Sequence, residues 1–484
     1  MGKRKRHDAP SHASARGQAP SKKPKSAEDN DETPSVTFQI ITGSYDRVLH
    51  GLTATVSSDN KVDFADTFLF NAHSSAIRCL AVSPLSTPEP GKAQKVMLAS
   101  GSSDERINVY SISAHPPKRR EKDTLSSIAP RKILENAKNR ELGTLLHHES
   151  SVTQLSFPSR SKLISASEDS TIAVTRTRDW SLLSSIKVPI PKPQGRPSGD
   201  TAALGGTPAG VNSFAVHPSD KVMISVSKSE RCMRLWNLMT AKKAGVLNFS
   251  RDMLQSVGES KHSSGEARKV VWGETDGSDE FCVGFDRDLI VFGMDSTPRC
   301  TVMPEPKRKI HQFCYVATDS ALESRLLAVS TEDGRILFLS TSAEDLQTTS
   351  LDKNNKLERL PVAKLVAEIG GKEAGVTGRI KDFTICRVKR KGKDELFIPA
   401  GSSDGKVRLF KLSVNELAEA QKAGTSQKLG ILLGTYDTQN RVTCMSAFKM
   451  IPRPEGLEDS EDEFGGELSD DDSEDEQDVD EEDE

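Results

Sequence analysis

The hydrophobic and polar positions of this chain form short runs that are typical of β-strands. Two apolar runs flank a short polar segment, as in residues 98–112 (LASGSSDERINVYSI) and residues 398–412 (IPAGSSDGKVRLFKL). Gly, Ser and Asp, which favour turns, dominate the segment between the two runs. Each such pair therefore predicts two antiparallel strands that are joined by a tight turn.

This strand pair recurs along the chain. Seven copies are found when each is aligned on an acidic turn residue with an apolar residue three positions later, and successive copies lie 58, 65, 61, 56, 47 and 71 residues apart. A short acidic side chain suits a turn because it accepts hydrogen bonds from nearby backbone N–H groups. We therefore expect a structural role for seven acids, one in each copy: Asp46, Asp104, Asp169, Glu230, Asp286, Asp333 and Asp404.

Two further apolar runs accompany most of these pairs. One precedes the pair, as at residues 76–84 and 151–159, and a shorter one follows it, as at residues 143–148 and 181–188. Each copy thus predicts four short strands. Seven repeats of four antiparallel strands predict an all-β fold, a seven-bladed β-propeller.

The two ends of the repeat region are incomplete in a complementary way. Residues 440–450 resemble a first strand that no further strands follow, whereas residues 37–56 and 66–75 resemble second to fourth strands without a first. We expect them to form one blade, because a ring closed by both ends leaves no exposed sheet edge. The propeller would then span residues 36–452, between disordered tails at residues 1–35 and 453–484.

Three residues link these repeats to a known family. His73 and His148 each lie four residues before an apolar position, and Trp236 stands in the sequence LWN. These elements resemble the WD repeat, in which a His, an Asp and a Trp of one blade share hydrogen bonds. The resemblance implies a WD40-type propeller, although Tyr110 and Phe410 stand at the Trp position of other repeats.

Longer stretches narrow the resemblance. Residues 38–52 (FQIITGSYDRVLHGL), 281–293 (FCVGFDRDLIVFG) and 398–410 (IPAGSSDGKVRLF) are together similar to the p21-activated-kinase-interacting WD-repeat proteins. The fungal members of that family are nucleolar factors for assembly of the large ribosomal subunit. The resemblance therefore implies a part in pre-60S maturation and rRNA processing. For animal members it implies binding and restraint of a p21-activated kinase.

Charge is concentrated at the two ends of the chain. The net charge is −4, but Glu458 to Glu484 holds 18 acidic residues and no Lys or Arg, which leaves 66 basic and 52 acidic residues elsewhere. Oppositely charged ends are typical of proteins that work near nucleic acid or basic proteins. The basic amino-terminal end predicts nuclear import or a nucleic-acid arm, with a solvated charge run as the alternative. Its clusters comprise Lys3, Arg4, Lys5, Arg6, Lys22, Lys23 and Lys25.

The acidic tail has two interpretations. It either holds basic ribosomal proteins or histones in solution, or it serves only solubility. Ser460, Ser469 and Ser473 are each followed by acidic residues, the pattern that acidophilic kinases prefer, so they are candidate phosphorylation sites.

Basic loops within the repeats are candidate contacts for RNA phosphates or acidic partners. We expect them on the rims of the propeller, without base stacking, because no aromatic residues interleave with them. The candidates are Lys307, Arg308, Lys309, Lys389, Arg390 and Lys391.

No catalytic constellation is visible in the sequence. His147 and His148 are adjacent, and neighbouring strand residues point to opposite faces, so one metal could not easily take both. The turn acids are spread one per repeat, whereas an enzyme needs converging groups. The seven cysteines are scattered without a Cys-x-x-Cys pair, which argues against a disulfide framework or zinc site and for a reducing compartment. We expect a protein that is not an enzyme and has no cofactor, metal, small-molecule substrate or membrane partner.

The leading hypothesis is a scaffold of the nucleus and nucleolus that binds pre-60S assembly factors and ribosomal proteins. The first alternative is an adaptor that binds and negatively regulates a p21-activated kinase. The second is a chaperone that holds histones or other basic proteins with its acidic tail.

Overall fold

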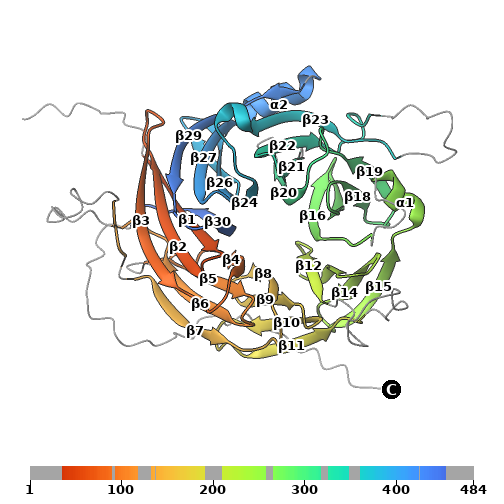
Figure 1. Cartoon of the computed structure of the whole chain (residues 1–484), viewed down its shortest axis with the longest axis horizontal. Helices are drawn as coiled ribbons and strands as arrows, with labels where there is room; N and C mark the ends of the chain where they lie inside the picture. Colours follow the sequence, from red (N-terminus) through yellow and green to blue (C-terminus); the bar gives the residue numbers. More distant parts are fainter. Residues whose placement is uncertain are drawn as a thin grey trace, which may run out of the picture. The chain divides into compact units, whose positions relative to one another are not determined.

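Seven mainly antiparallel sheets stand side by side in a ring in the computed structural model of the protein (Figure 1). The structure describes residues 35–89, 93–117, 132–136, 138–190, 210–257, 265–317, 325–347, 360–424 and 426–453, all within one compact unit of the chain. Each sheet has four or five strands, and we call it a blade. The prediction of an all-β, seven-bladed propeller is confirmed.

The first blade combines both ends of the described chain, and the next three blades follow in sequence order. From the centre of the ring outwards, the first blade contains β30 (Val442–Lys449), β1 (Val36–Ser44), β2 (Val48–Val56) and β3 (Val62–Asn71), and the second contains β4 (Ile77–Val82), β5 (Lys95–Ser102), β6 (Ile107–Ser113) and β7 (Arg140–Leu145). The third blade contains β8 (Val152–Ser159), β9 (Lys162–Ser167), β10 (Thr171–Arg176) and β11 (Leu182–Lys187). The fourth contains β12 (Val211–Val216), β13 (Val222–Ser227), β14 (Cys232–Asn237) and β15 (Lys242–Asn248).

The fifth to seventh blades complete the ring. The fifth blade contains β16 (Lys269–Thr275), β17 (Ser278–Gly284), β18 (Leu289–Gly293) and β19 (Pro298–Val302). The sixth contains β20 (Ile310–Ala317), β21 (Arg325–Thr331), β22 (Arg335–Ser340), β23 (Lys364–Gly370) and β28 (Gln427–Lys428). The seventh contains β24 (Ile380–Phe383), β25 (Cys386–Arg390), β26 (Lys393–Ser402), β27 (Lys406–Ser413) and β29 (Ile431–Asp437). The helical segments are α1 (Arg251–Ser256), the 3₁₀ turn η1 (Lys372–Ala374) and α2 (Val414–Ala423).

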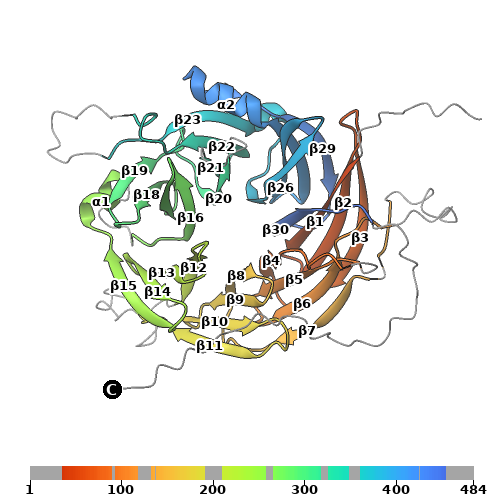
Figure 2. The same cartoon turned by 180° about the vertical axis from the view of Figure 1, so that it is seen from behind.

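The ring is closed by strands from far apart in the sequence. β30 pairs with β1, so that Ile40 lies opposite Ala447. The inner strands contact one another in the order β4, β8, β12, β16, β20, β24 and β30, and β30 contacts β4 again (Figure 2). The predicted closure of one blade by both ends is confirmed.

The hydrophobic core lies between the blades. Seven clusters of buried residues are found in the described part of the chain, and each combines residues of two neighbouring blades. Between the seventh and first blades, for example, the rings of Phe38 and Phe397 have centroids 5.0 Å apart. The second and third strands are therefore covered on both sides, which explains their nearly continuous apolar runs.

The inner strands run in the same direction, as the hydrogen bonds between residues at their starts show. Thr153 Oγ1 donates to Val211 O at 2.7 Å, and Thr443 Oγ1 donates to Ile77 O at 2.6 Å. The ring therefore has two distinct faces. We call the face with the turns between second and third strands, and with the connections between blades, the turn face. The opposite one, with the turns between first and second strands, is the hairpin face.

One element was not predicted from the apolar runs. Helix α2 lies between β27 and β29, and it packs on strands of both the sixth and the seventh blade. Its Leu417 is fully buried in the cluster between these blades. β28, just after the helix, pairs in parallel with β23 of the sixth blade. This insertion therefore ties two neighbouring blades together at their outer edge.

Candidate functional site

The seven predicted turn acids lie on the turn face, one in each blade. Five of these turns have the same length. In each of them, the two strand residues that pair on either side of the turn are as far apart in the sequence as Gly101 and Ile107. In these turns the residue after the acid has a positive φ, such as 70° at Glu105 and 82° at Gly334. The five acids are Asp46, Asp104, Asp169, Asp333 and Asp404.

The other two turns depart from this geometry. The turn of Glu230 is one residue longer, since Val226 pairs with Met233, and its positive φ of 55° falls on Ser229, before the acid. The turn of Asp286 is one residue shorter, since Gly284 pairs with Leu289. The seven acids are therefore not equivalent. The spacing to the next apolar residue is the same in every copy, so it could not reveal this difference.

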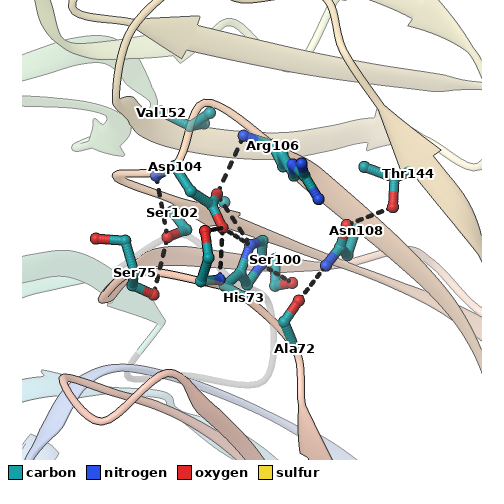
Figure 3. A network of polar contacts seen from close by, with 12 residues as sticks. Ala72, His73, Ser75, Ser100, Ser102, Asp104, Arg106, Asn108, Thr144 and Val152 are labelled. Atoms are coloured by element: carbon teal, nitrogen blue, oxygen red, sulfur yellow. Dashed lines mark hydrogen bonds and ion pairs between the residues drawn. The ribbon is translucent and has the colours of Figure 1, made fainter.

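In the second blade, Asp104 fastens the turn to the connection from the first blade (Figure 3). Its carboxylate accepts the Ser74 N–H at 2.9 Å and lies 3.2 Å from His73 Nδ1, while His73 Nε2 lies 2.8 Å from Ser100 Oγ. Burial opposes ionisation of Asp104, but these hydrogen bonds and His73 outweigh it and lower the pKa of the carboxyl group. Burial lowers the pKa of His73. Because a carboxylate only accepts hydrogen bonds, His73 carries a proton on the Nδ1 that faces Asp104.

The third blade repeats this arrangement. His148 Nδ1 lies 3.0 Å from the Asp169 carboxylate, and His148 Nε2 lies 2.8 Å from Ser165 Oγ. Burial raises the pKa of Asp169, but hydrogen bonds from His148, Thr171 and the Glu149 N–H overcome this and lower it to about 2. Both histidines singled out in the sequence thus contact the turn acid of their own blade.

An arginine takes the place of the histidine in three other blades. It follows the acid by two or four residues and its guanidinium forms a close ion pair with the carboxylate. These partners were not predicted from the sequence, although each arginine follows its acid within four residues. The pairs, with N–O distances of 2.6, 2.8 and 2.9 Å, are Glu230 with Arg234, Asp333 with Arg335, and Asp404 with Arg408.

Trp236 donates to the serine that corresponds to the second partner of the two histidines. Its indole Nε1–H donates to Ser225 Oγ at 2.8 Å, and Ser225 stands at the strand position that Ser100 and Ser165 hold in the second and third blades. The Trp236 side chain is buried between the third and fourth blades. These polar contacts fix turns and strands to one another, which is a structural task.

A chain of polar contacts across four inner strands was also missed. Lys269 Nζ on β16 contacts Gln312 Oε1 on β20, and Gln312 Nε2 donates to Asp382 Oδ1 on β24 at 2.8 Å. Asp382 Oδ2 accepts the Met445 N–H of β30 at 2.9 Å. Burial lowers the pKa of Lys269 and raises that of Asp382. A polar residue at the same place in successive first strands was the available signal.

The structure places the two basic clusters predicted to contact RNA on opposite faces. Lys307, Arg308 and Lys309 lie on the turn face, in the connection between the fifth and sixth blades. Arg308 is exposed, Lys307 Nζ lies 3.2 Å from Asp288, and Lys309 Nζ lies 3.1 Å from Asp286. One contiguous RNA surface made by both clusters is therefore excluded.

The second cluster lies at the hairpin between β25 and β26. Lys389 and Lys391 are exposed. Arg390, however, is only 8% exposed, and its guanidinium donates to Ser57 O in the first blade at 2.6 Å. The expectation that Arg390 faces an external partner is corrected, because its side chain joins the seventh blade to the first.

The remaining predicted sites lie outside the described residues. They are the import residues Lys3, Arg4, Lys5, Arg6, Lys22, Lys23 and Lys25, and the serines Ser460, Ser469 and Ser473. In the described part of the chain, no group of three or more His, Cys, Asp or Glu side chains could hold a metal ion. No described helix is both long and apolar enough to cross a membrane.

Comparison with known proteins agrees with this geometry. Residues 65–111 and 139–174 match the family model of the WD domain, G-beta repeat, and these segments contain both His–Asp pairs. The protein is therefore a WD-repeat β-propeller protein, a class that typically serves as a non-catalytic scaffold in protein–protein interaction.

Its homologues include a yeast protein and several vertebrate ones, so the resemblance found in the sequence is confirmed. Protein MAK11 of Saccharomyces cerevisiae is 26% identical, covering 84% of this chain and 82% of the yeast protein. The p21-activated protein kinase-interacting protein 1-like of Danio rerio is 22% identical, covering 84% of this chain and 80% of its own length. The protein of that name from Gallus gallus is 23% identical, with 85% and 80% covered.

Proposed function

We propose that this protein is a nucleolar scaffold for assembly of the large ribosomal subunit, without catalytic activity of its own. The similarity to MAK11 along most of both chains carries the proposal. The sequence resemblance implies such a role for fungal members of the family. The basic amino-terminal clusters support a nuclear location, because a protein confined to the membrane-proximal cytoplasm does not need them.

The propeller supports a scaffold role through its rigidity. Each blade is buried against both neighbours, and β30 removes the sheet edge that would otherwise remain open. The two faces and the outer strands present different side chains to solvent. Exposed apolar residues stand on separate parts of the ring, such as Tyr45 on the turn face, Met294 on the hairpin face and Leu69 on outer strand β3. Such a body can hold several partners at once.

Affinity purification of the tagged full chain at moderate salt tests this proposal, because nonspecific binding to RNA weakens steeply as salt rises. We expect large-subunit ribosomal proteins, assembly factors and precursor rRNA to be recovered with it. Depletion of the protein should lower the amount of large subunits relative to small subunits. An unchanged ratio of large to small subunits after depletion would contradict the proposal.

A second candidate function is binding of a p21-activated kinase. It is favoured by the names of the Danio rerio and Gallus gallus homologues. We would expect the purified full chain to bind the regulatory region of such a kinase in a saturable way and to slow its activation. A titration that shows no saturable binding would remove this candidate without affecting the first.

A further inference from the structure

Cationic side chains gather on the turn face, where the inner strands of the fifth, sixth, seventh and first blades begin. These strands, β16, β20, β24 and β30, are consecutive neighbours around the ring (Figure 1). We call this group of residues, which immediately precede or begin the four strands, the basic arc. Its five cations are Arg268, Lys309, Arg379, Lys381 and Arg441, and the half-buried imidazole of His311 lies among them.

The side chains of the basic arc are close enough to repel one another. Burial lowers the pKa of the Lys381 ammonium, and Arg379, Arg441 and Lys309 lower it further. Burial also lowers the pKa of His311, with Lys381, Lys309 and Arg379 as additional causes. Cations from three different blades therefore act on the same small region.

Carboxylates of the described residues neutralise only part of this charge. Asp286 lies 3.2 Å from Arg268 and 3.1 Å from Lys309, and Glu332 lies 3.0 Å from Arg379. Exposed ion pairs of this kind are weak, so they do not prevent these cations from binding another anion.

The two remaining cations of the arc have described carboxylates nearby but not in contact with their side chains, since Glu332 acts on Lys381 and Asp46 accepts the Arg441 N–H at 3.2 Å. No described carboxylate forms an ion pair with the side chain of Lys381 or Arg441. The guanidinium of Arg441 instead lies over the ring of Tyr45, 5.8 Å from its centroid, and Tyr45 is 61% exposed. The arc is therefore a partly exposed surface with an excess of positive charge, on which Arg268, Arg379 and Arg441 are the exposed members.

The surroundings of the arc favour a slender ligand. Most turn acids lie further from the centre of the same face, at the junction of second and third strands, whereas Asp286 and Asp46 contact residues of the arc. A nucleic-acid helix that reached the arc would lie across these carboxylates, which repel phosphates. A single extended peptide is narrower than a nucleic-acid helix, so it can follow the start of the inner strands while covering fewer of these carboxylates. A carboxylate-rich peptide is therefore the better match.

The chain itself supplies such a segment. Residues 458–484 hold 18 acidic residues and no Lys or Arg. After β30, Ile451 N–H donates to Ala114 O at 2.9 Å on the hairpin face, so the tail starts on the opposite side from the arc. The 31 residues after Arg453 span up to about 100 Å when extended, whereas the eight residues of β30 span about 26 Å. The tail is long enough to reach around the ring.

We propose that residues 458–484 dock on the basic arc of their own chain and screen it from other anions. Tethering gives the tail a local concentration of about millimolar, which an untethered acidic peptide seldom reaches. An external anion binds the arc only by displacing the tail. The inference holds whichever partner the scaffold has, so it stands or falls independently of the proposed function.

Zero-length carbodiimide coupling of the full chain tests this contact, because it joins only carboxylates and amines that touch. At about 0.15 M salt we expect residues 458–484 to be coupled to Lys381 and Lys309, and these links to fall strongly at about 1 M salt. A mixture of isotope-labelled and unlabelled protein should show that the links form within one chain. Links to Lys389, Lys391 and Lys393 on the hairpin face, or to the amino-terminal lysines instead of Lys381, would overturn the proposal.

A second variant keeps both lysines that can be coupled, so a lower yield of the link reports weaker docking and not the loss of a reactive amine. Arg379→Ala with Arg441→Ala should lower the yield of the Lys381 link by about tenfold, as expected for two weak cation contacts. The matched control is Arg106→Ala with Arg140→Ala, which removes two exposed arginines outside the arc and should leave the yield unchanged. Equal yields in the two variants, with unfolding midpoints equal to that of the parent, would refute the docking.

RNA is the other anion that the same region could hold. Poly(U) RNA is added to the full chain, and the reactivity of Lys381 toward acetylation is followed. If no tail links form and poly(U) alone protects Lys381, the arc belongs to RNA and the tail proposal fails. If tail links form and poly(U) reduces them only at high concentration, the screening is supported.

Discussion

The carboxylate of Asp382 accepts the backbone N–H of Met445 at 2.9 Å, and this hydrogen bond joins β24 of the seventh blade to β30 of the first. The same carboxylate accepts Gln312 Nε2 on β20 at 2.8 Å. One side chain thus connects three blades at the point where the ring is closed.

Asp382→Ala should destabilise the propeller. It leaves the Met445 N–H and the Gln312 amide without an acceptor and removes the negative charge near Lys269. The expected loss is about 1–3 kcal/mol, typical of buried polar partners left unpaired. Urea unfolding measures it as a lower midpoint. Glu419→Ala, at an exposed position of α2, is the control and should have little effect. Equal midpoints for the two variants would contradict a closing role for Asp382.

Asp104→Ala should weaken the second blade. The substitution removes the acceptor of the Ser74 and Arg106 N–H groups and the partner of His73. We expect a loss of about 1–2 kcal/mol, as for other lost caps and turn acceptors. The neighbouring Glu105→Gln removes a charge from the same turn at an exposed position, so its unfolding midpoint should stay near that of the parent. An Asp104→Ala protein of parental stability that lost one partner would show a binding role instead.

Gly101→Ala should also be costly, because blades are tightly packed at this place. A Cβ at Gly101 would lie 2.7 Å from Val152 Cγ1 and 2.8 Å from Cys79 Sγ. Overpacking of this kind costs about 1–3 kcal/mol. Gly245, on outer strand β15, has no comparable neighbour, since a Cβ there would have Leu235 Cβ, at 3.9 Å, as its nearest described contact. Gly245→Ala is therefore the matched control, and its thermal unfolding midpoint should be unchanged or slightly higher.

His311 should titrate well below an ordinary histidine. Burial and the cations of the basic arc lower its pKa to about 4 from 6.5, with Asp286 opposing them. Because the unfolded chain binds this proton more tightly than the folded chain, protonation favours unfolding. The free energy of unfolding is therefore highest above about pH 6.5 and decreases as the pH falls from there to about 4. NMR of the imidazole, assigned with His311→Gln, measures this pKa.

The His311 measurement is best made with the acidic residues of 470–476 changed to Asn and Gln, because a docked carboxylate would raise the pKa. A midpoint near 6.5 in that variant would show that His311 is not surrounded as described. A higher midpoint in the parent than in the variant would agree with docking of the tail.

The sequence predicted the parts of the fold that depend on short-range pattern. The acid at each turn and the apolar residue three positions later recur in every blade, so the number of blades and the closing strand could be counted. The arginine partners of Asp333 and Asp404 lay within four residues, yet an acid–Arg spacing is common on any polar surface and did not stand out. The turn of Glu230 is one residue longer than the five similar turns, and an alignment on the acid and the next apolar residue does not detect this difference.

Contacts between distant strands could not be predicted in this way. Lys269 and Asp382 are more than a hundred residues apart, and only the order of blades brings them to the same place. The burial of Arg390 depends likewise on the neighbouring loop at Ser57. The basic arc combines residues from four separate repeats, each of which carries only one or two cations. Such sites become visible only when the ring is assembled.

The pairing of β30 with β1 also sets the order in which the protein can be completed during synthesis. Strand β1 leaves the ribosome early, but its partner follows some four hundred residues later. At about 5–20 residues per second, the edge of β1 stays unpaired for tens of seconds. A nascent chain that stops before Val442 therefore retains an open edge, and premature termination there should yield aggregating or chaperone-bound fragments rather than a six-bladed ring.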